Sequence, residues 1–105
     1  MLRHVAVFRW KAGTPDADVS AFAAGLASLP GLCPSIRGYR FGPDAGLGMS
    51  ANSDFAVVAD FDDADGYAEY ASHPAHLDVI SRLLRPIVDE RMSVQFSFRP
   101  EGDEG

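Results

Sequence analysis

The chain has 105 residues and a mass of 11.3 kDa, which is enough for one hydrophobic core but not for two. Hydrophobic residues make up 47% of it and charged residues 23%, a balance typical of a folded domain rather than a disordered one. Its formal net charge of −6 argues against a surface that binds nucleic acid or an anionic membrane.

The sequence also argues against a membrane or secreted protein. No apolar run approaches the roughly 20 residues that cross a bilayer, and the N-terminus lacks the pattern of a signal peptide. A single cysteine, Cys33, cannot form an internal disulfide, as is usual in a reducing compartment. We therefore expect a cytoplasmic protein with no membrane partner and no nucleic-acid partner.

The first predicted element is a strand over residues 4–10, which is apolar on both faces and so of the kind usually covered on both sides. A helix follows, with Thr14 as its N-cap and Pro15 in its first position. Its apolar stripe consists of Val19, Phe22, Ala23, Leu26 and Leu29. Pro30 and Gly31 are predicted to end this helix.

The middle of the chain predicts two further strands. Residues 36–41 predict a rather polar strand near a sheet edge. Residues 42–52 contain three glycines and a proline and predict a loop. Residues 55–61 form the clearest strand of the sequence, again apolar on both faces.

The last third predicts two short helices and a strand. Asp62 or Asp63 caps the first helix, which ends before Pro74 because a residue that precedes proline avoids helical backbone angles. In the second helical stretch the residues that share a face are Leu77, Ile80, Leu83 and Leu84. The final strand, residues 91–98, alternates apolar with polar side chains, and residues 100–105 predict an acidic tail.

This order, β-α-β-β-α-β, predicts a ferredoxin-like α+β fold over residues 1–99, with a four-stranded antiparallel sheet and helices on one face. Two helices can cover only one face of such a sheet. The strands at 4–10 and 55–61 are nevertheless apolar on both faces, and an uncovered apolar face is larger than soluble monomers usually tolerate. We therefore expect a homodimer whose sheets meet face to face, a dimeric α/β barrel.

Four segments together give a resemblance to a known family: residues 4–11, 38–42, 53–58 and, most specifically, 70–76 with their His-Pro-Ala-His tetrapeptide. On these residues the chain resembles the stress-responsive dimeric α/β-barrel (Dabb) family over nearly its whole length. That family is mostly uncharacterised. It includes plant stress proteins and olivetolic acid cyclase, a cofactor-free polyketide cyclase that catalyses an intramolecular aldol condensation.

The resemblance implies candidate catalytic residues. The cyclase's tyrosine before the tetrapeptide falls on Tyr70, and the tetrapeptide's second histidine falls on His76. The histidine at the start of the cyclase's first strand matches His4, whereas Phe55 stands where the cyclase has another histidine. The resemblance implies no cofactor.

These residue types suit an enolisation. His76 can accept a proton from a carbon next to a carbonyl, because imidazole titrates near neutrality. The Tyr70 hydroxyl stays protonated at neutral pH and can donate a hydrogen bond to the enolate oxygen. Structural roles stay open beside these: Tyr70 as a packing residue, His76 as a helix cap and His4 as a core histidine with a hydrogen-bond partner.

Zinc binding is another interpretation of the histidines His4, His73 and His76. Pro74 keeps the pair at 73 and 76 off a single helix face, and no cysteine or carboxylate completes a known ligand spacing. We therefore expect no metal site.

The predicted substrate-binding residues are His4, Ala6, Phe8, Phe22, Leu26, Val57, His73 and Leu77. The apolar members would line a space beside Tyr70 and His76 if the helices shield one sheet face. Such a space would suit a small hydrophobic, polyketide-like compound. Charged metabolites would fit poorly, because few arginines or lysines lie near these elements.

Two functions of different class follow from this. One is a cofactor-free cyclase or isomerase acting on an enolisable carbonyl compound, with His76 as the base and Tyr70 as the oxyanion donor. The other is a non-catalytic, stress-responsive dimeric binding protein. An open cavity shared by the two side chains favours the enzyme, and a filled interior favours the binding protein.

Overall fold

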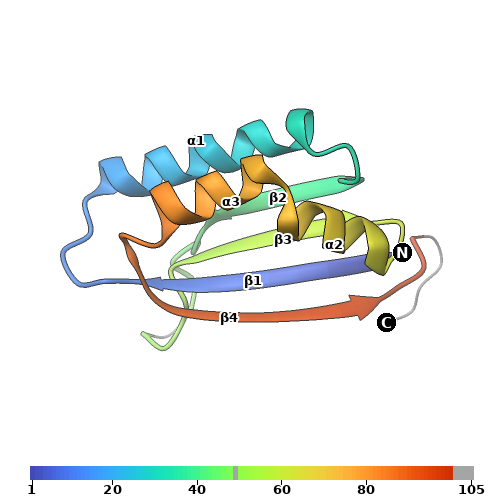
Figure 1. Cartoon of the computed structure of the whole chain (residues 1–105). Helices are drawn as coiled ribbons and strands as arrows, with labels where there is room; N and C mark the ends of the chain where they lie inside the picture. Colours follow the sequence, from blue (N-terminus) through green and yellow to red (C-terminus); the bar gives the residue numbers. More distant parts are fainter. Residues whose placement is uncertain (49, 101–105) are drawn as a thin grey trace.

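The computed structural model describes residues 1–48 and 50–100. One antiparallel sheet has the strand order β2-β3-β1-β4 (Figure 1). The strands are β1 (Leu2–Trp10), β2 (Gly38–Pro43), β3 (Phe55–Phe61) and β4 (Val88–Ser97). The helices are α1 (Asp16–Leu32), α2 (Ala64–Ser72) and α3 (Pro74–Val79), which continues into a π-helical turn, η1 (Ile80–Leu84). The predicted ferredoxin-like fold is confirmed.

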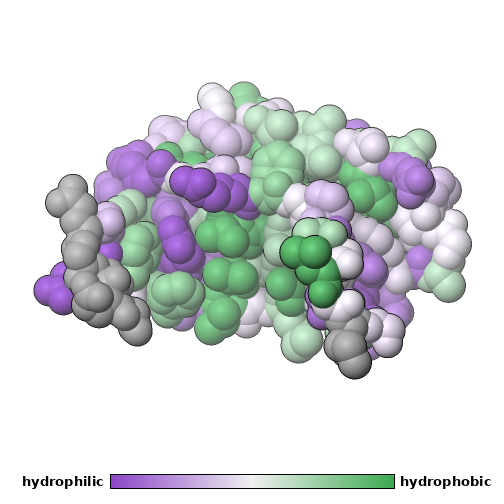
Figure 2. Space-filling view, turned by 180° about the vertical axis from the view of Figure 1, so that it is seen from behind, coloured by the Kyte–Doolittle hydropathy of each residue, from purple (hydrophilic) through white to green (hydrophobic). Residues whose placement is uncertain are grey.

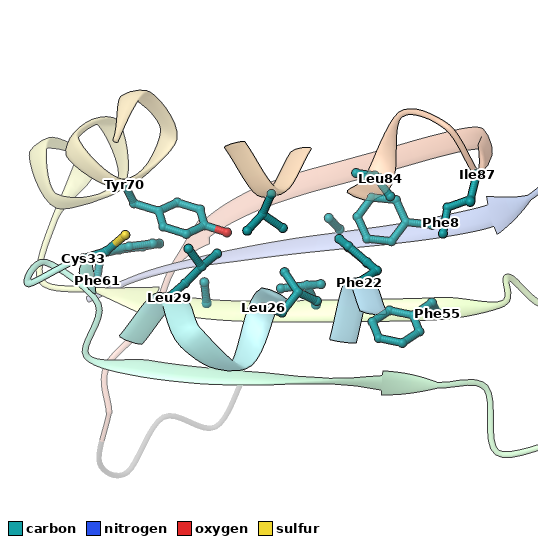
Figure 3. Close-up of a cluster of buried hydrophobic side chains, with 14 residues drawn as sticks. Phe8, Phe22, Leu26, Leu29, Cys33, Phe55, Phe61, Tyr70, Leu84 and Ile87 are labelled. Atoms are coloured by element: carbon teal, nitrogen blue, oxygen red, sulfur yellow. The ribbon is translucent and has the colours of Figure 1, made fainter. Parts of the chain in front are cut away.

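All the helices lie on one face of the sheet (Figure 1). The strand side chains on that face are buried, as at Ala6 and Phe8 of β1 and at Phe55 and Val57 of β3. The register Ala6↔Val57 and Phe8↔Phe55 brings them side by side. Figure 3 shows Phe8 and Phe55 in one cluster with Phe22, Leu26 and Leu29 of α1. The Phe22 ring packs 5.8 Å from that of Phe8.

The opposite sheet face is apolar and has no helix over it. Val5 and Val7 of β1 lie there at half-burial, between neighbours from β3 and β4. Exposure is greatest on β4, where Met92 is 63%, Val94 56% and Phe96 45% exposed. Seen from behind, hydrophobic residues gather in the middle of the molecule and hydrophilic ones flank them (Figure 2). We call this the open face.

The ends of α1 differ from the prediction. The helix starts at Asp16, so Pro15 occupies the N-cap position, and the Thr14 hydroxyl donates to the Lys11 carbonyl instead of capping the helix. The helix also continues through Pro30 to Leu32. A proline in the last turn removes only one hydrogen bond, and the chain beyond it still closes the helix through the bond from Cys33 N–H to the Leu29 carbonyl.

Two strands are displaced from their predicted ranges. Strand β2 is an edge strand, as expected, but it lies two residues later than residues 36–41. Strand β4 begins at Val88 rather than at residue 91, because Val88 already pairs with Trp10. The predicted tail at residues 100–105 lies outside the described residues except for Pro100. None of the helices within residues 1–48 and 50–100 is long and apolar enough to span a membrane.

In the helical pair after β3, the predicted start of the first helix is confirmed, and the predicted buried face of the second helix is wrong. Asp63 caps α2 by accepting from Gly66 N–H at 3.0 Å. Leu77, predicted to face the core with Leu84, is instead 51% exposed. Val79 and Leu84 are buried in its place. The hydrogen bonds of η1 join residues five apart, so this turn holds one residue more than an α-helical turn. An apolar face predicted for residues 77–84 with the 3.6-residue period of an α-helix therefore differs from the face that is buried.

Candidate functional site

A small hollow lies between the sheet and the helices. Its lining residues are His4, Ala6, Phe8, Phe22, Leu26, Val57, Tyr70, His76, Ile80 and Arg91. Its volume is about 20 Å³, space for about one water molecule. The structure therefore brings both predicted catalytic residues, Tyr70 and His76, to one place with most of the predicted substrate-binding residues.

Two predicted substrate-binding residues lie outside this lining. His73 joins α2 to α3, and its Nδ1 accepts a hydrogen bond from Ala75 N–H at 3.1 Å. Its ring therefore caps the first turn of α3. Leu77 points away from the core for the reason given above. Both predictions are therefore not supported by the positions of these side chains.

Tyr70 is a buried residue of α2, and Figure 3 shows its hydroxyl directed into the space between the helices and the sheet. The hydroxyl lies 2.8 Å from that of Tyr39 on β2. Burial raises the pKa of Tyr70 to about 12, with a smaller opposing effect from the hydrogen bond to Tyr39. Tyr70 therefore stays protonated at neutral pH, as a hydrogen-bond donor must.

His76 lies against Tyr70, with the two ring centroids 4.2 Å apart. Its Nδ1 is 3.2 Å from the Ala71 carbonyl, which can only accept, so Nδ1 carries the proton and Nε2 holds the lone pair. Burial lowers the pKa of His76, and the nearby charge of Arg91 acts in the same direction. The ring is therefore neutral at pH 7 and available as a base.

His4 has the opposite tautomer. It lies on β1, where the side-chain amide nitrogen of Gln95 donates to its Nδ1 at 2.8 Å, so the proton sits on Nε2. Burial lowers the pKa of His4 to about 4, and the charge of Arg91 adds to this effect. A neutral imidazole N–H donor and a neutral imidazole base thus line the same hollow.

The Nε2 atoms of His4 and His76 have no hydrogen-bond partner among the described residues. No buried side-chain nitrogen or oxygen among these residues lacks a partner. A buried Nε2 without a partner would belong to that group. Since neither histidine has one, both Nε2 atoms are in contact with solvent. A molecule that enters the hollow can therefore reach the lone pair of His76 and the N–H of His4.

Four residues of the site were not predicted from the sequence: Tyr39, Ile80, Arg91 and Gln95, the last through its hydrogen bond to His4. Arg91 reaches the hollow because it pairs with Phe8 in the β1–β4 register and so shares the helix-covered side of the sheet. The alternation in β4 predicts that Arg91 lies on the polar side of the strand. It does not predict which side of the strand faces the helices. Tyr39 had no signal beyond its place on an edge strand.

Three or more His, Cys, Asp or Glu side chains do not come together anywhere in the described ranges in a way that could hold a metal ion. The zinc interpretation of His4, His73 and His76 therefore has no geometric support. His73 is instead engaged by the N-terminus of α3.

The chain was compared with known proteins. Residues 2–98 match the family model of the stress responsive A/B barrel domain, Dabb. No curated protein matches the chain.

Solved structures give matches over almost the whole chain. A dimeric ferredoxin-like protein of unknown function from Thermobifida fusca is 38% identical, with a TM-score of 0.84 and coverage of 92% of this chain and 90% of that chain. A dimeric protein of unknown function from Bacteroides fragilis is 23% identical, with a TM-score of 0.82 and coverage of 92% and 95%. The hydroxynitrile lyase from Passiflora edulis is 15% identical, with a TM-score of 0.81 and coverage of 94% of each chain, a likeness of fold. The chain belongs to the stress-responsive A/B barrel (Dabb) family.

Proposed function

We propose that the protein is a homodimeric enzyme that catalyses cofactor-free acid–base chemistry on a small enolisable carbonyl compound, as an isomerase or cyclase. One observation carries the proposal: the lone pair of His76 and the protonated Tyr70 adjoin a single solvent-reachable hollow. The N–H of His4 supplies a second donor there.

The reaction would begin with proton abstraction. His76 Nε2 takes a proton from the carbon next to the carbonyl, and the electrons of that C–H bond form an enolate. Tyr70 or His4 donates a hydrogen bond to the enolate oxygen. An isomerase then returns the proton from His76 to a different carbon. In a cyclase the enolate carbon attacks a second carbonyl of the same molecule, and the new alkoxide takes the proton.

The electrostatics of the hollow support this sequence of steps. The lowered pKa of His76 keeps its lone pair free at pH 7. The apolar side chains around it, such as Phe8 and Val57, lower the local polarity, so hydrogen bonds to a developing oxyanion are stronger than they would be in water. A positioned acid–base pair typically accelerates a reaction by about 10²–10⁴-fold.

The size of the hollow favours a small substrate. About 20 Å³ admits only the reacting end of a molecule while the side chains keep these positions. A polyketide would need the lining to open further. One protein with this fold is a hydroxynitrile lyase, which supports acid–base catalysis as a function that the fold can carry.

The second candidate is a non-catalytic binding protein. Two observations favour it: the hollow is small, and the Tyr70 hydroxyl already has a partner in Tyr39. On that hypothesis the hollow binds a small molecule and neither histidine transfers a proton.

The homodimer would form through the open face. The dimeric relatives from Thermobifida fusca and Bacteroides fragilis support a dimer of this fold. Val94 and Phe96 would then be buried between the two sheets, which removes their exposed apolar surface from water.

Proton exchange tests the catalytic proposal without knowledge of the natural product. The protein is incubated in D₂O with small ketones and short β-keto thioesters, and the loss of the α-proton signals is followed by NMR. We expect exchange above the buffer rate, lowered about 100-fold or more in His76→Gln and Tyr70→Phe.

His73→Asn is the matched control, because Asn can still cap α3 and residue 73 does not line the hollow. Exchange equal to the buffer rate for every compound, with binding seen by ligand NMR, would support the binding protein instead.

A further inference from the structure

The polar side chains that line the hollow differ in charge from the chain as a whole, which is acidic. Three of its four polar side chains present a donor or a cation to it, His4, Tyr70 and Arg91, and the fourth, His76, is a neutral base. No carboxylate of residues 1–48 and 50–100 lines it, although the chain has fifteen acidic residues and nine basic ones. Two other surface hollows do include carboxylates, Asp44 in one and four acidic side chains of residues 62–69 in the other. The site beside Tyr70 is therefore chemically suited to a negative group.

Arg91 provides the only permanent charge in this lining. Its side chain has no hydrogen bond and no ion pair with any residue of the described ranges. Four arginines are paired with carboxylates, as in Arg3 with Asp60 at 2.7 Å and Arg82 with Asp78 at 3.1 Å, whereas Arg40 and Arg85 have no ion pair within the described ranges but line no hollow with histidines. An exposed guanidinium at the rim of a hollow is thus left with its donors directed to solvent.

The charge of Arg91 also acts on the two histidines. It lowers the pKa values of His4 and His76, after burial, which is the larger cause for each. The guanidinium therefore lies close enough to both rings for its charge to act on them. A bound carboxylate would pair with the charge of Arg91, because an opposite charge stabilises a cationic group.

We propose that Arg91 is a carboxylate-binding subsite, and that the hollow takes a small carbonyl compound that also bears a carboxylate, an oxo acid. The guanidinium binds the carboxylate, in the bidentate geometry that arginine favours, while the carbonyl end lies toward Tyr70 and His76. This rests on the proposed function in using the same hollow as the substrate site. It also replaces the expectation that charged metabolites would fit poorly, which overlooked Arg91 because only β4 pairing brings it there.

The experiment compares acids with neutral analogues. Pyruvate, 2-oxobutanoate and 4-oxopentanoate are titrated against the protein beside their methyl esters, and the ring C–H signals of the histidines are followed by NMR. We expect the three acids to shift the signals of His4 and His76 saturably and to bind about tenfold or more tightly than the esters, because a charged hydrogen-bonded pair is lost in the ester.

Variants assign the effect to the guanidinium. Arg91→Gln is expected to remove the preference for the acids, and Arg91→Lys to keep part of it, as a charge without the planar fork. Arg85→Gln is the matched control, because it removes the same charge from an exposed residue outside the hollow. In the free protein Arg91→Gln should also raise the pKa values of His4 and His76, whereas Arg85→Gln should not.

Three results would overturn the subsite: equal binding of acids and esters, an acid preference that persists in Arg91→Gln, or conversion of a dimer to a monomer by that variant, which would mean that Arg91 pairs with the partner copy. None of these bears on proton exchange with neutral ketones. A failed proposal about catalysis, seen as absent exchange, is likewise distinct from loss of acid binding.

Discussion

Gln95 on β4 donates to Nδ1 of His4 on β1 across a directly paired position of the sheet. This hydrogen bond sets the tautomer of His4: Nδ1 accepts, so Nε2 carries the proton. It comes from the polar side of β4, whose apolar side forms the open face. The same strand therefore orients a site residue and presents the surface through which the proposed dimer forms.

Replacement of Gln95 by glutamate should raise the pKa of His4. A carboxylate would accept from Nδ1–H and stabilise the imidazolium, so the pKa of His4 should rise from about 4 toward its ordinary range near 6.5. Histidine NMR titration measures this. Gln95→Leu is the neutral control and should not produce a comparable rise. An unchanged pKa in Gln95→Glu would show that the two side chains are not paired in solution.

The stability of the fold should depend on pH through His4. Its pKa is about 4 in the folded chain against 6.5 when unfolded, so between these pH values the unfolded state binds more protons. The free energy of unfolding should therefore be highest above pH 6.5 and fall as the pH is lowered toward 4, by up to about 3 kcal/mol from this residue.

Urea unfolding at a series of pH values between 4 and 7.5 measures the effect. His4→Gln removes the titrating group and should flatten the profile in this range. A variant with the same slope as the wild-type chain would contradict the assignment to His4.

His73 should matter for stability rather than for binding. Its Nδ1 accepts from Ala75 N–H, so His73→Ala should lower the free energy of unfolding by about 1 kcal/mol through loss of the cap, and His73→Asn should retain most of it. Chemical denaturation compares the two variants. If His73→Asn loses as much stability as His73→Ala, the ring contributes by packing and not as a cap.

The proposed dimer predicts a strong difference between two exposed apolar residues. Val94 on the open face and Leu77 on α3 are exposed to similar extents, 56% and 51%. Val94→Asp would bury a charge between the sheets and should raise the dimer dissociation constant about 100-fold or more, whereas Leu77→Asp should have no such effect. Sedimentation at micromolar concentration decides this. A wild-type chain that sediments at the monomer mass of 11.3 kDa would refute the interface.

The parts of the fold that follow from local chemistry were predictable. Alternation fixed which residues of β1 and β3 share a face, because side chains in a strand point to opposite sides in turn. The boundary at Pro74 also followed from a local steric rule. The end of α1 did not, because a proline so close to a helix C-terminus costs too little to stop it.

The apolar lining of the hollow followed from the strand and helix patterns, but its candidate catalytic pair was predictable only through the family resemblance. Tyr70 and His76 are six residues apart on two helices, and their spacing alone does not bring their rings together. Arg91 and Gln95 belong to the site through the register of β4 against β1, a contact between distant parts of the chain. No local pattern determines that register, nor which side of a one-sided strand the helices will cover.

The π-helical turn η1 lets the helix beside the site carry one residue more than an α-helical turn would, between the segment that holds His76 and the buried Leu84. Because a π-helical turn takes up this residue within about the rotation of one α-helical turn, the side chains before and after it keep their relative directions. Deletion of a single residue from η1 should therefore yield a regular α-helix that still holds the imidazole against Tyr70. The same deletion in a regular α-helical turn would rotate the imidazole by about 100°, so η1 is the one place in this helix where a shorter chain keeps the site.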